Sequence, residues 1–231
     1  MTRDVRPGTE AAAYFAELMK DRPIRLAVAG YSRAPESYEQ GSRNFLHGLA
    51  RSLQGLVGFI TSPTDTPGSI DRSTVQAAGR AGAPLALITA VDYLGEAGTP
   101  QQPIFVYPTP EDYSRATAEH SNALLVLGGR TASIDDFLHA IERHHRVVIV
   151  IDAAVAKPPW EGGRVEDASR YLKQMWERNY DAIPLDDVYN ARMLGLLESR
   201  REKLGSLLRI VEASDPGAVS EAAEFLRPGA P

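Results

Sequence analysis

The chain has 231 residues, no cysteine and a formal net charge of −5 at pH 7. The lack of cysteine excludes disulfides, thiolate metal sites and a cysteine nucleophile. The negative charge argues against a nucleic-acid partner and against an anionic membrane surface. With 43% hydrophobic and 24% charged residues, the composition is that of a soluble globular protein.

No membrane or secretory segment is predicted. The residues from Met1 to Arg6 are charged and no apolar segment follows them. The longest apolar runs, such as Ala123–Leu127, fall far short of the roughly 20 residues that a membrane span needs. We therefore expect a cytoplasmic protein.

Helix and strand patterns alternate from residue 9 to residue 151. In chain order, the expected elements are helix Thr9–Lys20, strand Ile24–Ala29, helix Glu39–Gln54, strand Leu56–Thr61, helix Ile70–Ala81, strand Pro84–Thr89, strand Ile104–Tyr107, helix Pro110–Glu119, strand Ala123–Leu127, helix Ile134–His145 and strand Val147–Ile151. The strands are almost continuously apolar, which is typical of strands covered on both faces. The alternation predicts a Rossmann-like α/β fold, with one parallel sheet of about five or six strands and helices on both faces.

The pattern changes after Pro158-Pro159. Helical periodicity continues through Val165–Asn179, Asp186–Ala213 and Ala218–Leu226. This predicts a nucleotide-binding domain over residues 1–159 and a helical C-terminal extension over residues 160–231. The second of these helices has an apolar stripe, which consists of Met193, Leu196, Leu197, Leu204, Leu207, Leu208 and Val211. The stripe must be buried, either against the sheet or against a second copy of the chain in a homodimer.

Three strand ends carry candidate ligand contacts. Open parallel sheets bind ligands beyond the carboxyl ends of their strands, where helix N-termini present free N–H groups. After the first strand, Gly30 permits a sharp turn and Ser32 has a hydroxyl for a phosphate or ribose oxygen. A plain turn between strand and helix explains both residues equally well.

The loop after the second strand is rich in hydroxyl groups and leads directly into a helix. Its glycine, Gly68, gives it flexibility, and its candidate ligand contacts are Ser69, Asp71 and Arg72. The alternative is that Ser69 or Asp71 only caps the helix.

The most informative strand end follows Leu127. Gly128 and Gly129 allow a backbone approach that a Cβ atom would block, so we expect them to hold a phosphate together with Arg130 and Thr131. Asp135 lies in the first turn of the next helix. There it would bind ribose hydroxyls or stabilise positive charge at an anomeric carbon, unless it only complements the helix dipole.

Four segments resemble the SLOG superfamily, which includes the LOG phosphoribohydrolases and the DNA-processing protein DprA. They are the strand that ends in Gly-Tyr-Ser, PGSIDRSTVQAAGRAGAPLALIT, ALLVLGGRTASIDDFLHAI and RVVIVID. The LOG signature Pro-Gly-Gly-x-Gly-Thr-x-x-Glu matches here at Gly128 and Gly129, with Asp135 in place of its glutamate. The sequence departs from this signature at Leu127, Thr131 and Ala132. The turn from Pro67 to Arg72 is nearer to the Gly-Ile-Asp turn of the DprA branch.

The resemblance implies an N-glycosidase that cleaves the base–ribose bond of a nucleoside monophosphate or a related nucleotide. Asp135 would then stabilise the transition state, and Arg115, the nearest candidate for the catalytic arginine of the LOG branch, would pair with phosphate or assist the departing base. The alternative is a non-catalytic SLOG domain that senses a nucleotide-derived ligand, because aspartate withdraws the carboxylate by about one methylene.

No cofactor and no metal site is predicted. The five histidines show no spacing typical of metal ligands. The sequence also lacks a Gly-x-Ser-x-Gly elbow and a Walker Gly-Lys-Ser/Thr motif, which disfavours an α/β-hydrolase and a P-loop NTPase. The expected partner is thus a small nucleotide ligand.

Overall fold

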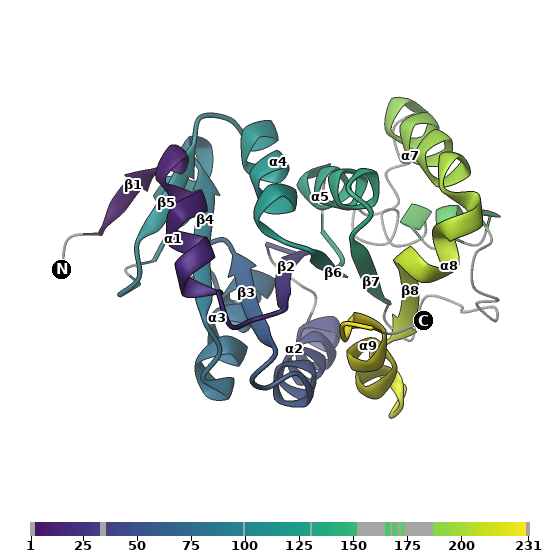
Figure 1. Ribbon diagram of the computed structural model, residues 1–231, viewed down its shortest axis with the longest axis horizontal. Helices are drawn as coiled ribbons and strands as arrows, with labels where there is room; N and C mark the ends of the chain where they lie inside the picture. The colour runs from purple at the N-terminus through teal and green to yellow at the C-terminus, as the bar shows by residue number, and fades with distance from the viewer. Residues whose placement is uncertain are drawn as a thin grey trace.

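A computed structural model describes residues 3–32, 36–98, 100–129, 131–151, 165–166, 168–170, 172–173 and 187–229. Within these residues, eight parallel strands form one sheet in the order β1-β5-β4-β3-β2-β6-β7-β8 (Figure 1). The strands are β1 (Val5–Pro7), β2 (Ile24–Gly30), β3 (Val57–Thr61), β4 (Leu85–Ala90), β5 (Ile104–Tyr107), β6 (Ala123–Leu127), β7 (Arg146–Ile151) and β8 (Leu208–Glu212). The predicted Rossmann-like α/β fold is confirmed.

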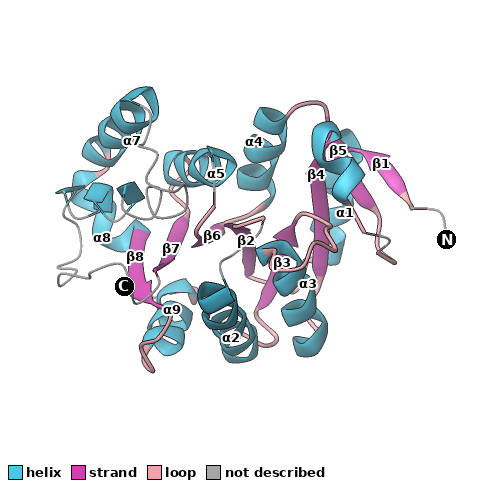
Figure 2. Cartoon of the chain, turned by 180° about the vertical axis from the view of Figure 1, so that it is seen from behind, coloured by secondary structure: helices cyan, strands magenta, loops and turns pink. Residues whose placement is uncertain are grey.

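Helices cover both faces of the sheet (Figures 1 and 2). One face carries α1 (Ala11–Leu18), α4 (Pro110–His120), α5 (Thr131–Glu142) and α7 (Asp187–Ser199). The other face carries α2 (Glu36–Ser52), α3 (Ile70–Ala81) and α9 (Ala218–Leu226). The short helices are η1 (Gly8–Glu10), η2 (Val91–Glu96), η3 (Arg201–Lys203) and α8 (Leu204–Leu207).

A hydrophobic core lies on each face of the sheet. The strands contribute side chains to both cores, because successive side chains of a strand point to opposite faces. In β2, Ala27 packs into the core below α4 and α5, whereas Leu26 and Val28 pack into the core with α2 and α3. This double burial explains why the strands read as continuous apolar runs rather than alternating ones.

The six predicted strands correspond to β2–β7, and the sheet gains one strand at each edge. The predicted long helix Asp186–Ala213 is wrong, because α7 ends at Ser199 and residues Leu208–Glu212 form β8. This strand pairs with β7, with Val147 opposite Leu208. The β-branched residues Ile210 and Val211 favour a strand, and pairing satisfies backbone groups at the edge of β7.

The C-terminal part of the chain belongs to the same sheet. Besides β8, it contributes α9, which packs on α2 where Val219 meets Gly48. The expected boundary between residues 159 and 160 lies outside the described residues, as does much of the expected helix Val165–Asn179, so the division into two parts stays a prediction. The prediction that the extension is purely helical is wrong, because the extension also contains β8.

The apolar stripe of the C-terminal segment is buried largely within the chain. All seven members lie in the two cores or beside them. Five are buried in the core on the α5 face, namely Met193, Leu197, Leu204, Leu207 and Leu208; Leu196 packs beside that core, and Val211 is buried in the core on the α2 face. Burial against the sheet therefore accounts for the stripe, and the homodimer stays a prediction. None of the described helices combines the length and apolarity that a membrane span needs.

Candidate functional site

A cavity of about 370 Å³ lies at the carboxyl ends of the central strands. The connections from β2 and β6 run outward to opposite edges of the sheet, so the point between these two neighbours is a topological switch point. The residues that line the cavity are Val28, Ala29, Gly30, Ser32, Ser62, Pro63, Thr64, Thr66, Ser69, Asp71, Tyr93, Tyr113, Ala132, Ser133 and Asp136. Most of its polar groups are hydroxyls.

The turn after β6 passes very close to the cavity wall. Gly128 and Gly129 have φ angles of 75° and 110°, in the left-handed region that favours glycine. A Cβ atom on Gly128 would collide with the ring of Tyr31, and one on Gly129 would collide with Ser133. Both positions therefore require glycine, and they bring the backbone against Ser133, which lines the cavity.

Asp71 connects the start of α3 to the end of β3. Its Oδ1 accepts hydrogen bonds from the Thr61 hydroxyl at 2.6 Å and from the backbone N–H of Ser62 at 3.1 Å. The Ser69 hydroxyl lies 3.4 Å from Oδ2, and Ser69 Oγ accepts the N–H of Asp71 as the N-cap of α3. Burial raises the pKa of Asp71, and these hydrogen bonds act in the opposite direction.

Asp136 is the most unusual group in the cavity wall. The residue is 4% exposed, and its Oδ1 has no hydrogen-bond partner among the described residues. Burial raises the pKa of Asp136 to about 8, a hydrogen bond with Ser114 lowers it, and the charges of Asp135 and Asp71 raise it further. Tyr113 lies nearby and its pKa is also raised by burial.

Of the predicted ligand contacts, Gly30, Ser32, Ser69 and Asp71 line the cavity. Gly68 and Arg72 lie outside the lining: Gly68 forms a turn at φ 80°, and Arg72 donates a hydrogen bond to the carbonyl oxygen of Asp65 at 3.3 Å. Arg130 and the side chain of Thr131 lie outside the described residues. The roles of all these residues in ligand binding stay predictions.

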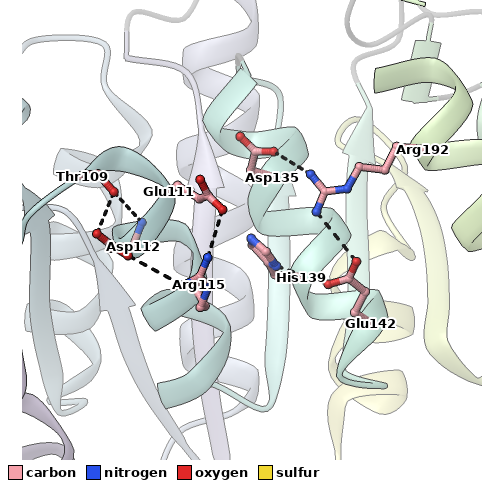
Figure 3. Close-up of polar contacts among 8 residues, drawn as sticks. All are labelled: Thr109, Glu111, Asp112, Arg115, Asp135, His139, Glu142 and Arg192. Carbon is pink, nitrogen blue, oxygen red and sulfur yellow. Dashed lines mark hydrogen bonds and ion pairs between the residues drawn. The ribbon is translucent and has the colours of Figure 1, made fainter. Parts of the chain in front are cut away.

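The two predicted catalytic residues, Asp135 and Arg115, are not among the residues that line the cavity. Figure 3 shows their polar contacts. Arg192 Nη1 of α7 is 3.5 Å from Asp135 Oδ1, and the Tyr189 hydroxyl donates to Asp135 Oδ2 at 3.3 Å. Burial raises the pKa of Asp135, which Arg192 and Tyr189 oppose. Arg115 donates to Glu111 at 3.0 Å on α4. The structure does not bring Asp135 and Arg115 together.

The sequence reasoning missed Tyr93, Tyr113 and Asp136 as cavity residues. Asp136 lies on the same side of α5 as Ala132 and Ser133, since residues three and four positions apart are neighbours on a helix surface. The three-residue spacing of Ser133 and Asp136 is the signal that separates Asp136 from its neighbour Asp135. Tyr93 lies in η2 and Tyr113 lies in α4, and only the fold shows that both residues line the cavity. No cluster of metal-ligand residues occurs in the part of the chain that the structure describes.

The sheet order and the cavity define a Rossmann-like α/β protein with a ligand-sized cavity at its switch point. No protein-family model matches the sequence, and no curated protein matches it either. The molybdenum cofactor carrier protein of Chlamydomonas reinhardtii has a similar structure, with a TM-score of 0.54 and 13% identity over 89% of this chain and 99% of that chain. The protein TM1055 is similar with a TM-score of 0.51 and 16% identity, over 88% of this chain and 98% of that chain. Such likeness is one of fold. It supports the Rossmann-like α/β fold and identifies no family.

Proposed function

We propose that the chain binds a nucleotide-type small molecule in the cavity at the β2–β6 switch point. The observation that carries this proposal is the contact between the cavity wall and the Gly128-Gly129 turn. The positive φ angles and the lack of room for a Cβ atom hold the backbone where a phosphate would lie, at the start of α5.

The polar groups of the cavity suit a ligand of this kind. Ser32 and Ser133 offer hydroxyls to ribose oxygens. Among the described residues that line the cavity there is no Lys, Arg or His. Phosphate charge would therefore be met by backbone N–H groups and by the positive end of the α5 dipole.

Hydrolysis of a base–ribose bond is the reaction that the SLOG resemblance adds to this proposal. Its predicted catalytic residues, Asp135 and Arg115, are each engaged with oppositely charged neighbours. The carboxyl groups in the cavity lining are instead those of Asp71 and Asp136. Turnover thus requires Asp135 to leave Arg192, or Asp136 to act in its place.

Binding without turnover is the second candidate. It is favoured by the contacts of Asp135 with Arg192 and Tyr189, which hold this carboxylate outside the cavity lining. One protein of similar fold is named as a carrier of the molybdenum cofactor, so this cofactor joins the nucleotides as a candidate ligand.

The test is a thermal-shift and product screen with nucleoside monophosphates, ADP-ribose, NAD and the molybdenum cofactor. Ala132→Phe fills the cavity from α5, and Ala191→Phe places the same side chain on an exposed position of α7 as the matched control. We expect a ligand to raise the melting temperature of the wild type and of Ala191→Phe but not of Ala132→Phe.

The outcomes separate the candidates. Release of free base that disappears in Asp135→Asn supports the hydrolase, and a thermal shift without release supports binding alone. A wild-type protein that responds to none of these ligands contradicts the proposed function.

A further inference from the structure

Arg192 brings a cation from the C-terminal segment to the side of α5. Its Nη1 lies 3.5 Å from Asp135 Oδ1, and its Nη2 lies 3.8 Å from Glu142 Oε1 (Figure 3). Hydrogen bonds between a guanidinium and a carboxylate are typically about 2.7–2.9 Å long. Both contacts of Arg192 are longer than this, and its side chain is 43% exposed. The guanidinium is therefore loosely held between two carboxylates and is free to exchange one of them for another anion.

The cavity next to this ion pair is acidic. Its lining contains the carboxyl groups of Asp71 and Asp136 and, among the described residues, no Lys, Arg or His. Besides burial, the charge of Asp135 raises the pKa of Asp136, so the field of Asp135 reaches the cavity wall. A field of this sign repels the phosphate of a nucleotide unless a cation offsets it. Arg192 is in contact with Asp135 and is placed to offset its charge.

Resting on the function proposed above, we propose that Arg192 is the residue that selects a phosphorylated ligand over an unphosphorylated one. The phosphate of the ligand takes the guanidinium over from Asp135, and the carboxylate of Asp135 is released in the same exchange. A guanidinium suits this role because its planar fork binds a phosphate through two short hydrogen bonds, whereas it meets Asp135 at 3.5 Å.

The proposed phosphate position lies close to Asp135 along α5. Asp135 comes four residues after Thr131, the first residue of the helix, which corresponds to about one helical turn or 5–6 Å. The phosphate is proposed to lie at this end of the helix, against the Gly128-Gly129 turn. The exchange therefore requires the long side chain of Arg192 to turn along α5 by about one helical turn.

The exchange also connects ligand binding to the release of Asp135. Hydrolysis would require Asp135 to leave Arg192, and a nucleoside without a phosphate leaves this ion pair intact. A phosphorylated ligand removes the partner of Asp135 and so frees the carboxylate for a ribose hydroxyl. One residue of α7 would then control both which ligand binds and when Asp135 becomes available.

The experiment measures the Kd of the full chain for adenosine 5′-monophosphate and for adenosine by calorimetry at neutral pH. We expect the wild type to prefer the monophosphate. Arg192→Gln removes the charge and should weaken binding of the monophosphate about tenfold or more, while the Kd for adenosine stays unchanged. Asp135→Asn releases Arg192 from its partner and should increase the preference for the monophosphate, because the phosphate no longer competes with a carboxylate.

Arg143→Gln is the matched control. The side chain of Arg143 is 44% exposed and pairs with Glu119 at 2.8 Å, just beyond the other end of α5. The same change of charge at this distance from the cavity should leave the preference for the monophosphate as it is in the wild type.

Arg192→Gln overturns the inference if it keeps the wild-type preference, or if it weakens the binding of both ligands equally. A preference that does not rise in Asp135→Asn contradicts the exchange. A wild type that binds the monophosphate no more tightly than adenosine also overturns the inference, whereas nucleotide binding itself survives if ADP-ribose or NAD still binds. If none of these four compounds binds, the proposed function fails, and this inference fails with it.

Discussion

The hydroxyl group of Thr61 donates a hydrogen bond of 2.6 Å to Oδ1 of Asp71, joining the end of β3 to the first turn of α3. Thr61 is 2% exposed. The contact fixes one wall of the cavity at the place where the chain turns from strand to helix. Because it satisfies a partly buried carboxyl group, it contributes to stability as well as to the shape of the site.

Replacing Thr61 by valine keeps the shape of the side chain and removes the donor. We expect Thr61→Val to lower the free energy of unfolding by about 1.5–3 kcal/mol at neutral pH, the range for a hydrogen bond to a charged group. The loss should shrink in acid, where Asp71 is protonated. Urea denaturation at two pH values measures both effects.

Thr89→Val is the matched control. Thr89 is equally buried at the end of β4, but its hydroxyl makes only long hydrogen bonds of 3.4 and 3.5 Å. We expect it to cost less than Thr61→Val. A larger loss at Thr89 would contradict the importance assigned to the Thr61–Asp71 contact.

Asp136 should make the stability of the protein fall as the pH rises. Its pKa of about 8 in the folded chain exceeds the usual value of about 3.9 in an unfolded chain. Between these values the folded state holds a proton that the unfolded state has lost, so the free energy of unfolding decreases with pH. Asp136→Asn should remove this slope.

The measurement is urea denaturation at pH 5 and pH 8. We expect Asp136→Asn to gain stability relative to the wild type from pH 5 to pH 8, by on the order of 2–4 kcal/mol. The exposed carboxyl group of Glu142 on the same helix provides the control, Glu142→Gln, which should show no such gain. Parallel pH profiles for Asp136→Asn and the wild type would exclude a raised pKa at Asp136.

Gly129 should tolerate no side chain. Its φ angle is 110°, and a Cβ atom would collide with Ser133 and lie 2.9 Å from the carbonyl oxygen of Gly30. We expect Gly129→Ala to lower the free energy of unfolding by more than about 1 kcal/mol. Gly79 lies in α3 with open space around it, so Gly79→Ala should instead stabilise the chain by about 0.5–1 kcal/mol. Thermal unfolding of the two variants gives the comparison.

The sequence predicts the central fold well because its strands and its helices have different patterns of apolar residues. Continuous apolar runs mark β2–β7, and the helices between them have period 3.6. The two edge strands of the sheet, β1 and β8, are harder to predict. β1 spans only Val5–Pro7 and carries Arg6, and β8 follows α8 directly, so its Leu208 and Val211 continue the apolar spacing of Leu204 and Leu207. Only pairing with β5 and β7 makes these segments strands.

The site is predictable where backbone geometry dictates the residue. The paired glycines and the helix cap Ser69 are visible in the sequence because a turn and a helix start need them. Which of Asp135 and Asp136 lines the cavity depends on the rotation of α5, which is set by the burial of Phe137 and Leu138. A local pattern does not carry that information, nor does it show that Arg192 approaches from α7.

The ion pair between Asp135 and Arg192 should contribute little to stability. The two side chains are 21% and 43% exposed and lie 3.5 Å apart (Figure 3). A double-mutant cycle with Asp135→Asn and Arg192→Gln should give a coupling energy of about 0.2–1 kcal/mol that falls with added salt. The more exposed pair Arg143–Glu119 is the reference, and its coupling should be smaller still. A coupling of several kcal/mol would mean that Asp135 is locked to α7, which would argue against its release for catalysis.

The last prediction concerns the C-terminal strand. Ile210 is 1% exposed in β8 and packs into the same core as Ile149 and Leu204. We expect Ile210→Ala to lower the free energy of unfolding by about 2–5 kcal/mol, the range for large-to-small changes in a core. Val188 of α7 is 75% exposed, so Val188→Ala should stay within about 0.5 kcal/mol of the wild type. If β8 is integral to the sheet, Ile210→Ala should shift one cooperative transition seen by both far-UV and near-UV circular dichroism. Two separate transitions, of which Ile210→Ala moves only one, would instead support a C-terminal part that unfolds independently of the rest of the sheet.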